Sequence, residues 1–405
     1  MSGPLSGFKV LEVAQWWFVP AACAVLADWG AEVVKIEHPV TGDPQRGLAT
    51  MGWKSREGNV DFMMQQSNRG KRSVGVDLAV PAGRDLVLRL AAESDVFVTS
   101  FLPDARRRLG IDVDDIRAVN PRIVYVRGSG QGPLGPDCEK GGYDATAFWS
   151  RGGVGAALTP AAADEPVMQR PAFGDSIGAL ALAGGVAAAL LERERTGAAS
   201  VVDTSLLNTA MWVLAPDIVA SPLVDPSRWM PPFHRASHFS PLTNAYRTKD
   251  GRWLMLVLLQ ASRYWADFCR HVDRPELIDD PRFATDAARF EHREACIAEL
   301  DRAFEAHTLE EWRTKLATME GPWAPMQTPP ELHDDLQASA NGYLARVDGG
   351  DKGQFRLVAS PVQFDGRTPT LRPSPEMGQH TEEVLLELGV SWEAIAALKE
   401  ARAIV

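Results

Sequence analysis

FKVLEVAQWWFVPAACAVLADWGAEVVKI, residues 8–36, opens with the stretch from Phe8 to Val13, whose pattern is typical of a buried strand. A helix is expected from Pro20 to Trp29, ended by Gly30, and a second strand from Glu32 to Ile36. Two such strands joined by a helix lie parallel in one sheet. The stretch therefore predicts an α/β fold built in layers.

The same alternation continues through the first half of the chain. Further strands are expected at Ser73 to Leu78, Val96 to Thr99, Ile123 to Arg127 and Ser200 to Asp203, and helices at Arg84 to Ala92 and Asp175 to Glu194. The run Ile177 to Leu191 is apolar but shorter than the roughly 20 residues of a membrane span. We therefore expect it to be a buried helix and expect no membrane association.

The pattern changes after residue 215. Prolines, histidines and tryptophans without periodicity predict a linker over 216–243. A smaller α+β domain is expected over 244–325, and a second linker over 326–345. Residues 346–405 are expected to return to the large domain that begins with 1–215, so that both termini build it.

Within these parts the local patterns are specific. We expect a hairpin over Asn244 to Leu259, helices at Arg263 to Val272, Arg289 to Ala306, Thr308 to Met319 and Thr381 to Leu388, and a strand at Leu357 to Phe364.

Composition excludes some classes of protein. The chain has 405 residues, of which 45% are hydrophobic, and a net charge of −11, which argues against a general nucleic-acid binder. Its four cysteines form no C-x-x-C pair and no zinc-site spacing, so we expect no metal and a reducing compartment. Residues 1–9 have no signal-peptide pattern, and a cytoplasmic location is predicted.

The first strand–helix turn argues against a nucleotide cofactor. A dinucleotide fingerprint needs glycines there, because they let the backbone approach the pyrophosphate. The turn from Ala14 to Pro20 is bulky and contains no glycine. The chain also lacks a G-x-x-x-x-G-K-[ST] loop and an H-E-x-x-H pair.

Basic residues nevertheless gather near predicted strand ends and helix starts. They are Arg46, Arg69, Lys71, Arg72 and the run from Arg106 to Arg108. Such residues suit the phosphates of an anionic ligand. Each one alone is more typical of a solvated surface charge, and it is their concentration in one half of the chain that favours an anionic ligand.

Two aspartates stand at turns that precede helices. Asp175 follows Pro171-Ala172-Phe173-Gly174 at the start of the apolar helix, and Asp144 follows Tyr143. A carboxylate at such a turn is commonly an N-cap, which accepts amide hydrogens of the first helical turn. It can also be a reactive group, and the residues alone leave both interpretations open.

Seven segments in order resemble the family III CoA-transferases, which include formyl-CoA transferase, carnitine CoA-transferase and α-methylacyl-CoA racemase. The segments are Leu5 to Glu12, Asp28 to Glu37, Asn68 to Ser73, Gly141 to Asp144, Phe173 to Asp175, Pro322 to Pro325 and Gly378 to Glu382. The resemblance implies a large doubly wound, Rossmann-like domain, a smaller α+β domain and a homodimer of two interlocked, ring-like chains.

The resemblance also implies a reaction. Asp175, after Gly174, matches the nucleophile that forms a mixed anhydride with the acyl group of an acyl-CoA donor and then an aspartyl-CoA thioester. A carboxylic acid acceptor then takes the CoA, which is a substrate, and no cofactor is permanently bound. The helix N-terminus is expected to keep Asp175 ionised and to hold a developing oxyanion.

Positions that contact CoA in the family are carried over one by one. They are Trp16, Trp17, His38, Val76, Ser100, Phe101, Arg108 and, more loosely, Lys140. His38 stands where arginine is usual, and Ser100 where asparagine is usual. Acyl-pocket candidates are Trp229, Met230, His234, His238 and Trp323.

The pair Tyr143-Asp144 separates the two activities of the family. Racemases have His-Asp there, because a histidine with a pKa of about 6.5 can remove an α-proton, whereas a tyrosine at about 10 suits this poorly. The transferase is therefore favoured. The alternatives are a 2-methylacyl-CoA racemase that uses Asp175 as acid/base and a non-catalytic acyl-CoA-binding protein.

Overall fold

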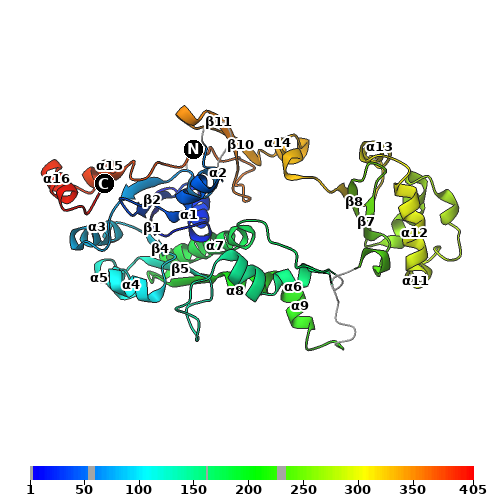
Figure 1. The fold of residues 1–405 in the computed structure, drawn as a ribbon, viewed down its shortest axis with the longest axis horizontal. Coiled ribbons are helices and arrows are strands. Elements are labelled where there is room, and N and C mark those ends of the chain that lie inside the picture. Colours follow the sequence, from blue (N-terminus) through cyan, green and yellow to red (C-terminus); the bar gives the residue numbers. More distant parts are fainter. Residues whose placement is uncertain (1–2, 53–59, 161–162, 226–233) are drawn as a thin grey trace. The chain divides into compact units, whose positions relative to one another are not determined.

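The computed structural model describes residues 3–52, 60–160, 163–225 and 234–405. The chain divides into two compact units. The larger contains Met1–Ala156, Val167–Pro226 and Leu336–Val405, and the smaller contains Ala157–Pro166 and Ser227–Asp335. Both ends of the chain therefore belong to the larger unit (Figure 1).

A six-stranded sheet forms the centre of the larger unit, in the order β3-β2-β1-β4-β5-β6 (Figure 1). Its strands are β1 (Lys9–Val13), β2 (Glu32–Glu37), β3 (Arg72–Gly75), β4 (Val96–Thr99), β5 (Val124–Ser129) and β6 (Val201–Ser205). All neighbouring pairs are parallel, which confirms the predicted α/β sheet. The strand order reverses between β1 and β4, where ligands of open α/β sheets bind beyond the carboxyl ends of the strands.

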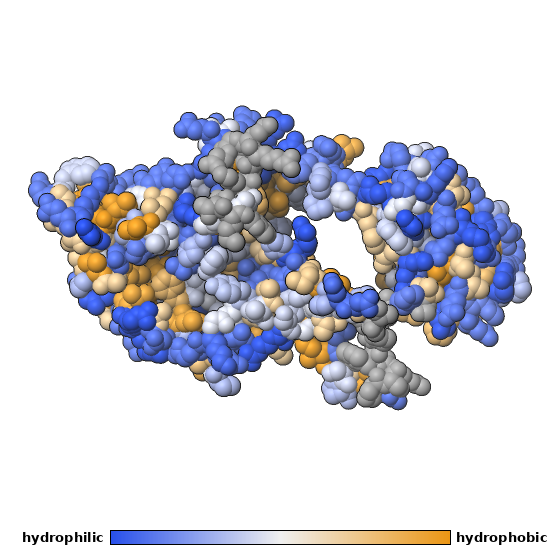
Figure 2. Space-filling view, in the orientation of Figure 1, coloured by the Kyte–Doolittle hydropathy of each residue, from blue (hydrophilic) through white to orange (hydrophobic). Residues whose placement is uncertain are grey.

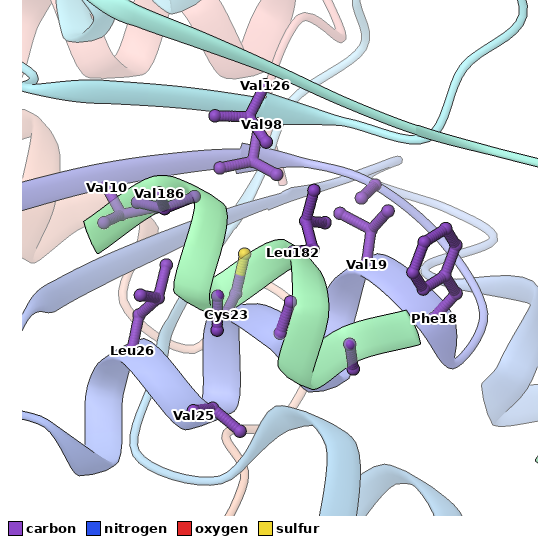
Figure 3. Packing of buried hydrophobic residues seen from close by; sticks show 14 of the residues in the cluster. Val10, Phe18, Val19, Cys23, Val25, Leu26, Val98, Val126, Leu182 and Val186 are labelled. Carbon is purple, nitrogen blue, oxygen red and sulfur yellow. The ribbon is translucent and has the colours of Figure 1, made fainter. Parts of the chain in front are cut away.

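Helices cover both faces of this sheet. On one face α1 (Phe18–Asp28) and α7 (Phe173–Thr196) pack on alternate strand residues, so that Leu182 and Val186 of α7 lie near Val98 and Val126 (Figure 3). The other face is covered by α3 (Pro81–Ala92), α5 (Val113–Val119), α15 (Thr381–Glu387) and α16 (Trp392–Glu400). Because strand side chains alternate between faces, Val10 joins the first cluster and Leu11 the second.

Helix α7 is long and apolar enough to span a membrane by length and composition, and it is the only such helix among the described residues. Its residues Ala179, Leu182, Ala183, Val186 and Leu190 are buried against α1 and the sheet. This packing accounts for much of the apolar run that the sequence predicts to be a buried helix.

The remaining elements of the larger unit are short. They are η1 (Pro44–Met51), α2 (Phe62–Asn68), α4 (Pro103–Leu109), η2 (Asp144–Arg151), α6 (Val154–Leu158), α8 (Leu206–Val213), α9 (Ala215–Ala220), α14 (Leu336–Ala340), β10 (Leu344–Asp348), η6 (Gly350–Lys352) and β11 (Gln354–Val358). Helix α9 occupies the start of the expected linker 216–243. Strand β11 ends at Val358, so most of the strand expected at Leu357 to Phe364 is wrong.

The smaller unit has its own core, which includes Tyr246, Phe268, Phe304 and Trp312. The side of it that Figure 2 shows is mostly hydrophilic. Its elements are η3 (Arg235–Ser237), β7 (Thr243–Arg247), β8 (Trp253–Val257), α10 (Ala261–His271), η4 (Pro275–Leu277), α11 (Asp286–Glu291), α12 (Arg293–Phe304), α13 (Leu309–Lys315), β9 (Trp323–Pro325) and η5 (Pro329–His333). The single helix expected at Arg289 to Ala306 is wrong, because the backbone of His292 (φ −101°, ψ 27°) leaves the helical region and separates α11 from α12.

Candidate active site

Asp175 lies in the first turn of α7, where a strained residue starts the helix. Ala172, immediately before α7, has φ 58° and ψ 24°, in the left-handed region that non-glycine residues rarely adopt. At Gly174 an added Cβ would lie 2.2 Å from the ring of Phe148 and 2.6 Å from Oδ1 of Asp144. Only glycine allows this approach, so Gly174 is what brings the start of α7 against Asp144.

Asp144 caps α7 from a distant part of the chain. The amide of Gly174 donates to both carboxylate oxygens, at 3.1 Å to Oδ1 and 3.2 Å to Oδ2, and the amides of Phe173 and Asp175 also point to this carboxylate. Asp144 itself is the first residue of η2, a π-helical segment. The free amides of the first turn of α7 therefore donate hydrogen bonds to Asp144 and not to Asp175. The N-cap interpretation of Asp175 is wrong.

The two carboxyl groups, which we call the carboxyl pair, differ in their surroundings. Burial first, and then the charge of Asp144, raise the pKa of Asp175 to about 8. Burial raises the pKa of Asp144 to about 6, although the amides of α7 and the side chain of Gln169 favour its charged form. The expectation that the helix end keeps Asp175 ionised is therefore wrong, because the helix amides hold its neighbour instead.

Gln169 is a site residue that the sequence did not reveal. Its side chain hydrogen-bonds to Asp144, and its Oε1 is buried without a hydrogen-bond partner in the described part of the chain. A buried acceptor left in this way is costly and is unusual in a native structure. No local motif marks Gln169, and only its position six residues before Asp175 could have drawn attention to it.

The turn between β1 and α1 brings two tryptophans to the same place. Nε1 of Trp17 donates to Oγ of Ser176 at 3.1 Å, directly after Asp175. The ring of Trp16 meets the ring of Tyr143 edge to face, with centroids 5.6 Å apart. Trp16, Trp17 and Tyr143 therefore lie close to the carboxyl pair.

A buried ionic cluster of Glu12, Lys35, Asp43 and Lys71 lies beneath this turn. Lys35 contacts Glu12 at 2.8 Å and Asp43 at 2.9 Å, Lys71 contacts Glu12 at 2.6 Å, and these side chains are fully buried. Burial opposes ionisation of Glu12, yet the two lysines outweigh it and lower the pKa of this carboxyl. The lysines also bind backbone oxygens of the turn, Lys35 that of Ala14 and Lys71 that of Pro20.

Three predicted phosphate ligands pair with carboxylates of the protein. Lys71 belongs to the buried ionic cluster and is inaccessible to a ligand. Arg46 forms a two-pronged pair with the buried Glu37, which holds the pKa of that carboxyl at about 2. Arg72 begins β3 at the amino edge of the sheet, away from the carboxyl ends, and pairs there with Glu32 and with Glu387 at 2.7 Å.

A cavity of about 270 Å³ lies at the carboxyl ends of β1, β2 and β4 and brings together other predicted CoA contacts. His38, Val76 and Phe101 line it. Ser100 lies beside it, since its Oγ accepts the amide hydrogen of Gln15 at 3.0 Å. The Nδ1 of His38 accepts two backbone amides, and its Nε2 lies 3.7 Å from Asp77.

Two predicted cations lie on the surface. Arg108 is exposed and lies 3.6 Å from Asp104, and Lys140 is exposed and pairs with Asp137 at 2.7 Å. Among the acyl-pocket candidates, Trp229 and Met230 lie outside the described residues, whereas His234, His238 and Trp323 belong to the smaller unit. In the described part of the chain, no group of three or more His, Cys, Asp or Glu side chains could hold a metal ion.

Comparison with known proteins shows which family the chain resembles. A family model described as CoA-transferase family III matches residues 5–381. An (R)-2-hydroxy-4-methylpentanoate CoA-transferase of Clostridioides difficile is 32% identical and covers 99% of each chain. A succinyl-CoA:glutarate CoA-transferase of Homo sapiens is 29% identical over 95% of this chain and 86% of its own length. The crystal structure of the D175A mutant of Rv3272 from Mycobacterium tuberculosis superposes with a TM-score of 0.80, at 28% identity over 95% of this chain and 99% of that one.

Proposed function

The chain belongs to family III of the CoA-transferases, and from this premise we propose that it moves CoA between carboxylic acids through a covalent intermediate on Asp175. One observation carries the assignment of Asp175. Its carboxyl group accepts no hydrogen bond and meets no cation among the described residues, while the helix amides beside it bind Asp144. A carboxylate stabilised so little is a stronger nucleophile than one that is paired or capped.

The proposed steps conserve charge throughout. A carboxylate oxygen of Asp175 attacks the thioester carbon of the donor, the C–S bond breaks, and a mixed anhydride and CoA thiolate form. The thiolate attacks the Asp175 carbonyl, which releases the donor acid and leaves an aspartyl-CoA thioester. The acceptor carboxylate attacks that thioester and again forms an anhydride and thiolate, and the thiolate then takes the acceptor acyl group and frees Asp175.

We place the nucleotide end of CoA in the cavity lined by His38, Val76 and Phe101. It lies at the switch point of the sheet, and its lining includes Gln15, which leads directly to Trp16 and Trp17 at the carboxyl pair. Lys71 and Arg46 pair with internal carboxylates, whereas Arg108 is exposed, and we propose that it contacts the phosphates. This path supports entry of the thioester beside Asp175.

We further propose that two chains form an interlocked homodimer, as the resemblance implies. Exposed apolar side chains on the larger unit support an interface, among them Leu191 of α7, Trp212 of α8, which is 80% exposed, and Val219 of α9. Light scattering of the purified protein should give twice the chain mass of 44.1 kDa. The unpaired Cys23, Cys138, Cys269 and Cys296 suit the reducing cytoplasm, where we place the dimer.

Replacement of Asp175 tests the proposed function. We expect Asp175→Ala and Asp175→Asn to reduce kcat for CoA transfer at least about 10,000-fold, because the residue that forms both covalent intermediates is lost. Circular dichroism should show that both variants fold. An Asp175→Ala protein that retained full transfer activity would refute the assignment.

The racemase alternative is supported by one observation. The pKa values of Asp175, about 8, and Asp144, about 6, lie apart as they do in acid/base pairs. Incubation of 2-methylacyl-CoA with the enzyme in deuterated water separates the two functions. A transferase leaves the α-proton in place, whereas rapid exchange without any acceptor acid would establish the racemase.

A further inference from the structure

Among the described residues, no positively charged side chain contacts the carboxyl pair. Three cations lie close to it in the sequence. Lys140 and Arg151 both pair with Asp137 at 2.7 Å, and Arg170 is exposed and forms no ion pair with a described residue. No positively charged side chain in the described ranges lowers the pKa of Asp175. Within the described residues, a second carboxylate held at the carboxyl pair would therefore be repelled by the negative charge of Asp144.

Aromatic rings surround the same place. Tyr143, directly before Asp144, is 61% exposed and meets the ring of Trp16. Phe173, two residues before Asp175, is 46% exposed and meets the ring of Trp149 edge to face, with centroids 6.3 Å apart. Such rings bind apolar and aromatic groups through their faces and edges.

The position of Trp16 is built into the fold. Its backbone has φ 68°, in the left-handed region, which is costly for a bulky residue. Its amide donates to Oδ1 of the buried Asp43 at 3.0 Å, and Lys35 holds the other oxygen of Asp43. Among the described residues only five non-glycine residues have a positive φ, and two of them, Trp16 and Ala172, flank the carboxyl pair. The buried pair of Asp43 and Lys35 therefore holds Trp16 at a strained backbone position.

We propose that the acids exchanged at this site are apolar monocarboxylic acids, preferably aromatic or branched, and that Trp16 and Tyr143 select them against dicarboxylic acids. This inference rests on the proposed transfer at Asp175. Trp16 and Tyr143 provide an apolar surface for the acyl chain, and the absence of a cation beside Asp175 leaves a second carboxylate without compensation. The rings therefore favour apolar acids, while the uncompensated charge disfavours dicarboxylic acids.

Self-exchange tests the proposal one acid at a time. Each acyl-CoA is incubated with its own isotopically labelled free acid, and label in the thioester is measured for 3-phenylpropanoate, 4-methylpentanoate, glutarate and succinate. We expect kcat/KM for the two monocarboxylates to exceed that for the dicarboxylates by at least about tenfold. Equal or faster exchange of glutarate would overturn the proposal and leave the transferase intact. Absence of exchange with all four acids would count against the proposed function itself.

Variants identify the selecting residues. Trp16→Gly removes the ring and places at φ 68° the residue that adopts this backbone freely, so the fold is not strained further. We expect the ratio of 3-phenylpropanoate to glutarate exchange to fall about tenfold, mainly through KM of the aromatic acid. Asp365→Gly, at another left-handed position (φ 55°), is the matched control and should leave the ratio unchanged. An unchanged ratio in Trp16→Gly would remove Trp16 from the proposal.

Arg170→Ala examines the one cation that could bind a second carboxylate from the loop before α7. We expect exchange of glutarate to be unaffected by it. If glutarate is a good substrate and Arg170→Ala abolishes its exchange, the site selects dicarboxylates and the proposal is wrong.

Discussion

The buried ionic cluster and the carboxyl pair both place carboxylates inside the larger unit, but they treat them in opposite ways. In the cluster each acid touches a lysine, and the pKa of Glu12 is lowered. In the carboxyl pair no cation is present among the described residues, and the pKa of Asp175 is raised to about 8. Paired buried charges hold the β1–α1 turn in place, whereas the unpaired acid keeps its reactivity.

Breaking the cluster should have the largest effect on stability. Lys71→Met removes one of two lysines on Glu12 and leaves a buried carboxylate with less compensation. We expect a loss of about 3–5 kcal/mol in the free energy of unfolding, measured by urea denaturation. Lys9→Met removes an exposed lysine whose pairing distance is 3.8 Å and should cost less than about 1 kcal/mol. Equal losses in the two variants would show that the cluster is not what stabilises the turn.

Neutralising Asp144 should change how activity depends on pH. Transfer needs the carboxylate of Asp175, so kcat/KM should rise with pH through an apparent pKa of about 8. Asp144→Asn removes the neighbouring negative charge and can still cap α7, so the rise should move to lower pH. Asp114→Asn, an exposed acid on α5, is the control. A profile that stays in place in Asp144→Asn would mean that Asp144 does not tune Asp175.

The sequence predicts features that depend on residues adjacent in the chain, but not contacts between residues that only the fold brings together. The strands of the parallel sheet are rich in valine and other β-branched residues, so β1, β2 and β4 were predictable from residues such as Val10 and Val96. The glutamate partners of Lys71 and Arg46 were not predictable, because a basic residue near a strand end has the same local sequence whether its partner is a phosphate or a buried glutamate. Glu12 pairs with Lys71 and Glu37 pairs with Arg46, and each pair comes together only when the sheet forms.

The site shows the same limit. Asp175 and the glycine before it were recognisable, because Gly174 and the apolar helix are adjacent in the chain. The cap on α7 comes from Asp144, about 30 residues away. The sequence therefore suggested Asp175 as the acceptor of the helix amide hydrogens, whereas the acceptor is Asp144. Gln169 was missed for the same reason, since its contact with Asp144 depends on the fold.

Removing the acid at position 175 should stabilise the fold. A raised pKa means that the folded state disfavours the carboxylate of Asp175. The free energy of unfolding is therefore undiminished by this acid below about pH 4, and stability is lost as pH rises through about 8. Asp175→Asn should therefore be more stable than the natural protein by on the order of 1 kcal/mol at pH 8, with little difference at pH 4.5. Thermal unfolding at several pH values measures this gain, and a variant that is less stable at pH 8 would contradict the raised pKa.

The smallest effect is expected at Ala172. Ala172→Gly relieves the left-handed backbone before α7 but makes the unfolded chain more flexible, so the two contributions nearly cancel. We expect the free energy of unfolding to change by less than about 1 kcal/mol and kcat to fall modestly as the start of α7 loosens. A loss of several kcal/mol would show that Ala172 makes contacts beyond its backbone.

Chemical trapping tests the central claim that Asp175 becomes covalently modified. The enzyme is incubated with an acyl-CoA donor, treated with hydroxylamine, digested and analysed by mass spectrometry, with Asp175→Asn treated in parallel. Hydroxylamine attacks activated acyl groups such as anhydrides and thioesters, so we predict a hydroxamate on the peptide that contains Asp175 and none in the variant. CoA transfer that proceeds while Asp175 stays unmodified, or a hydroxamate on another residue, would contradict the account.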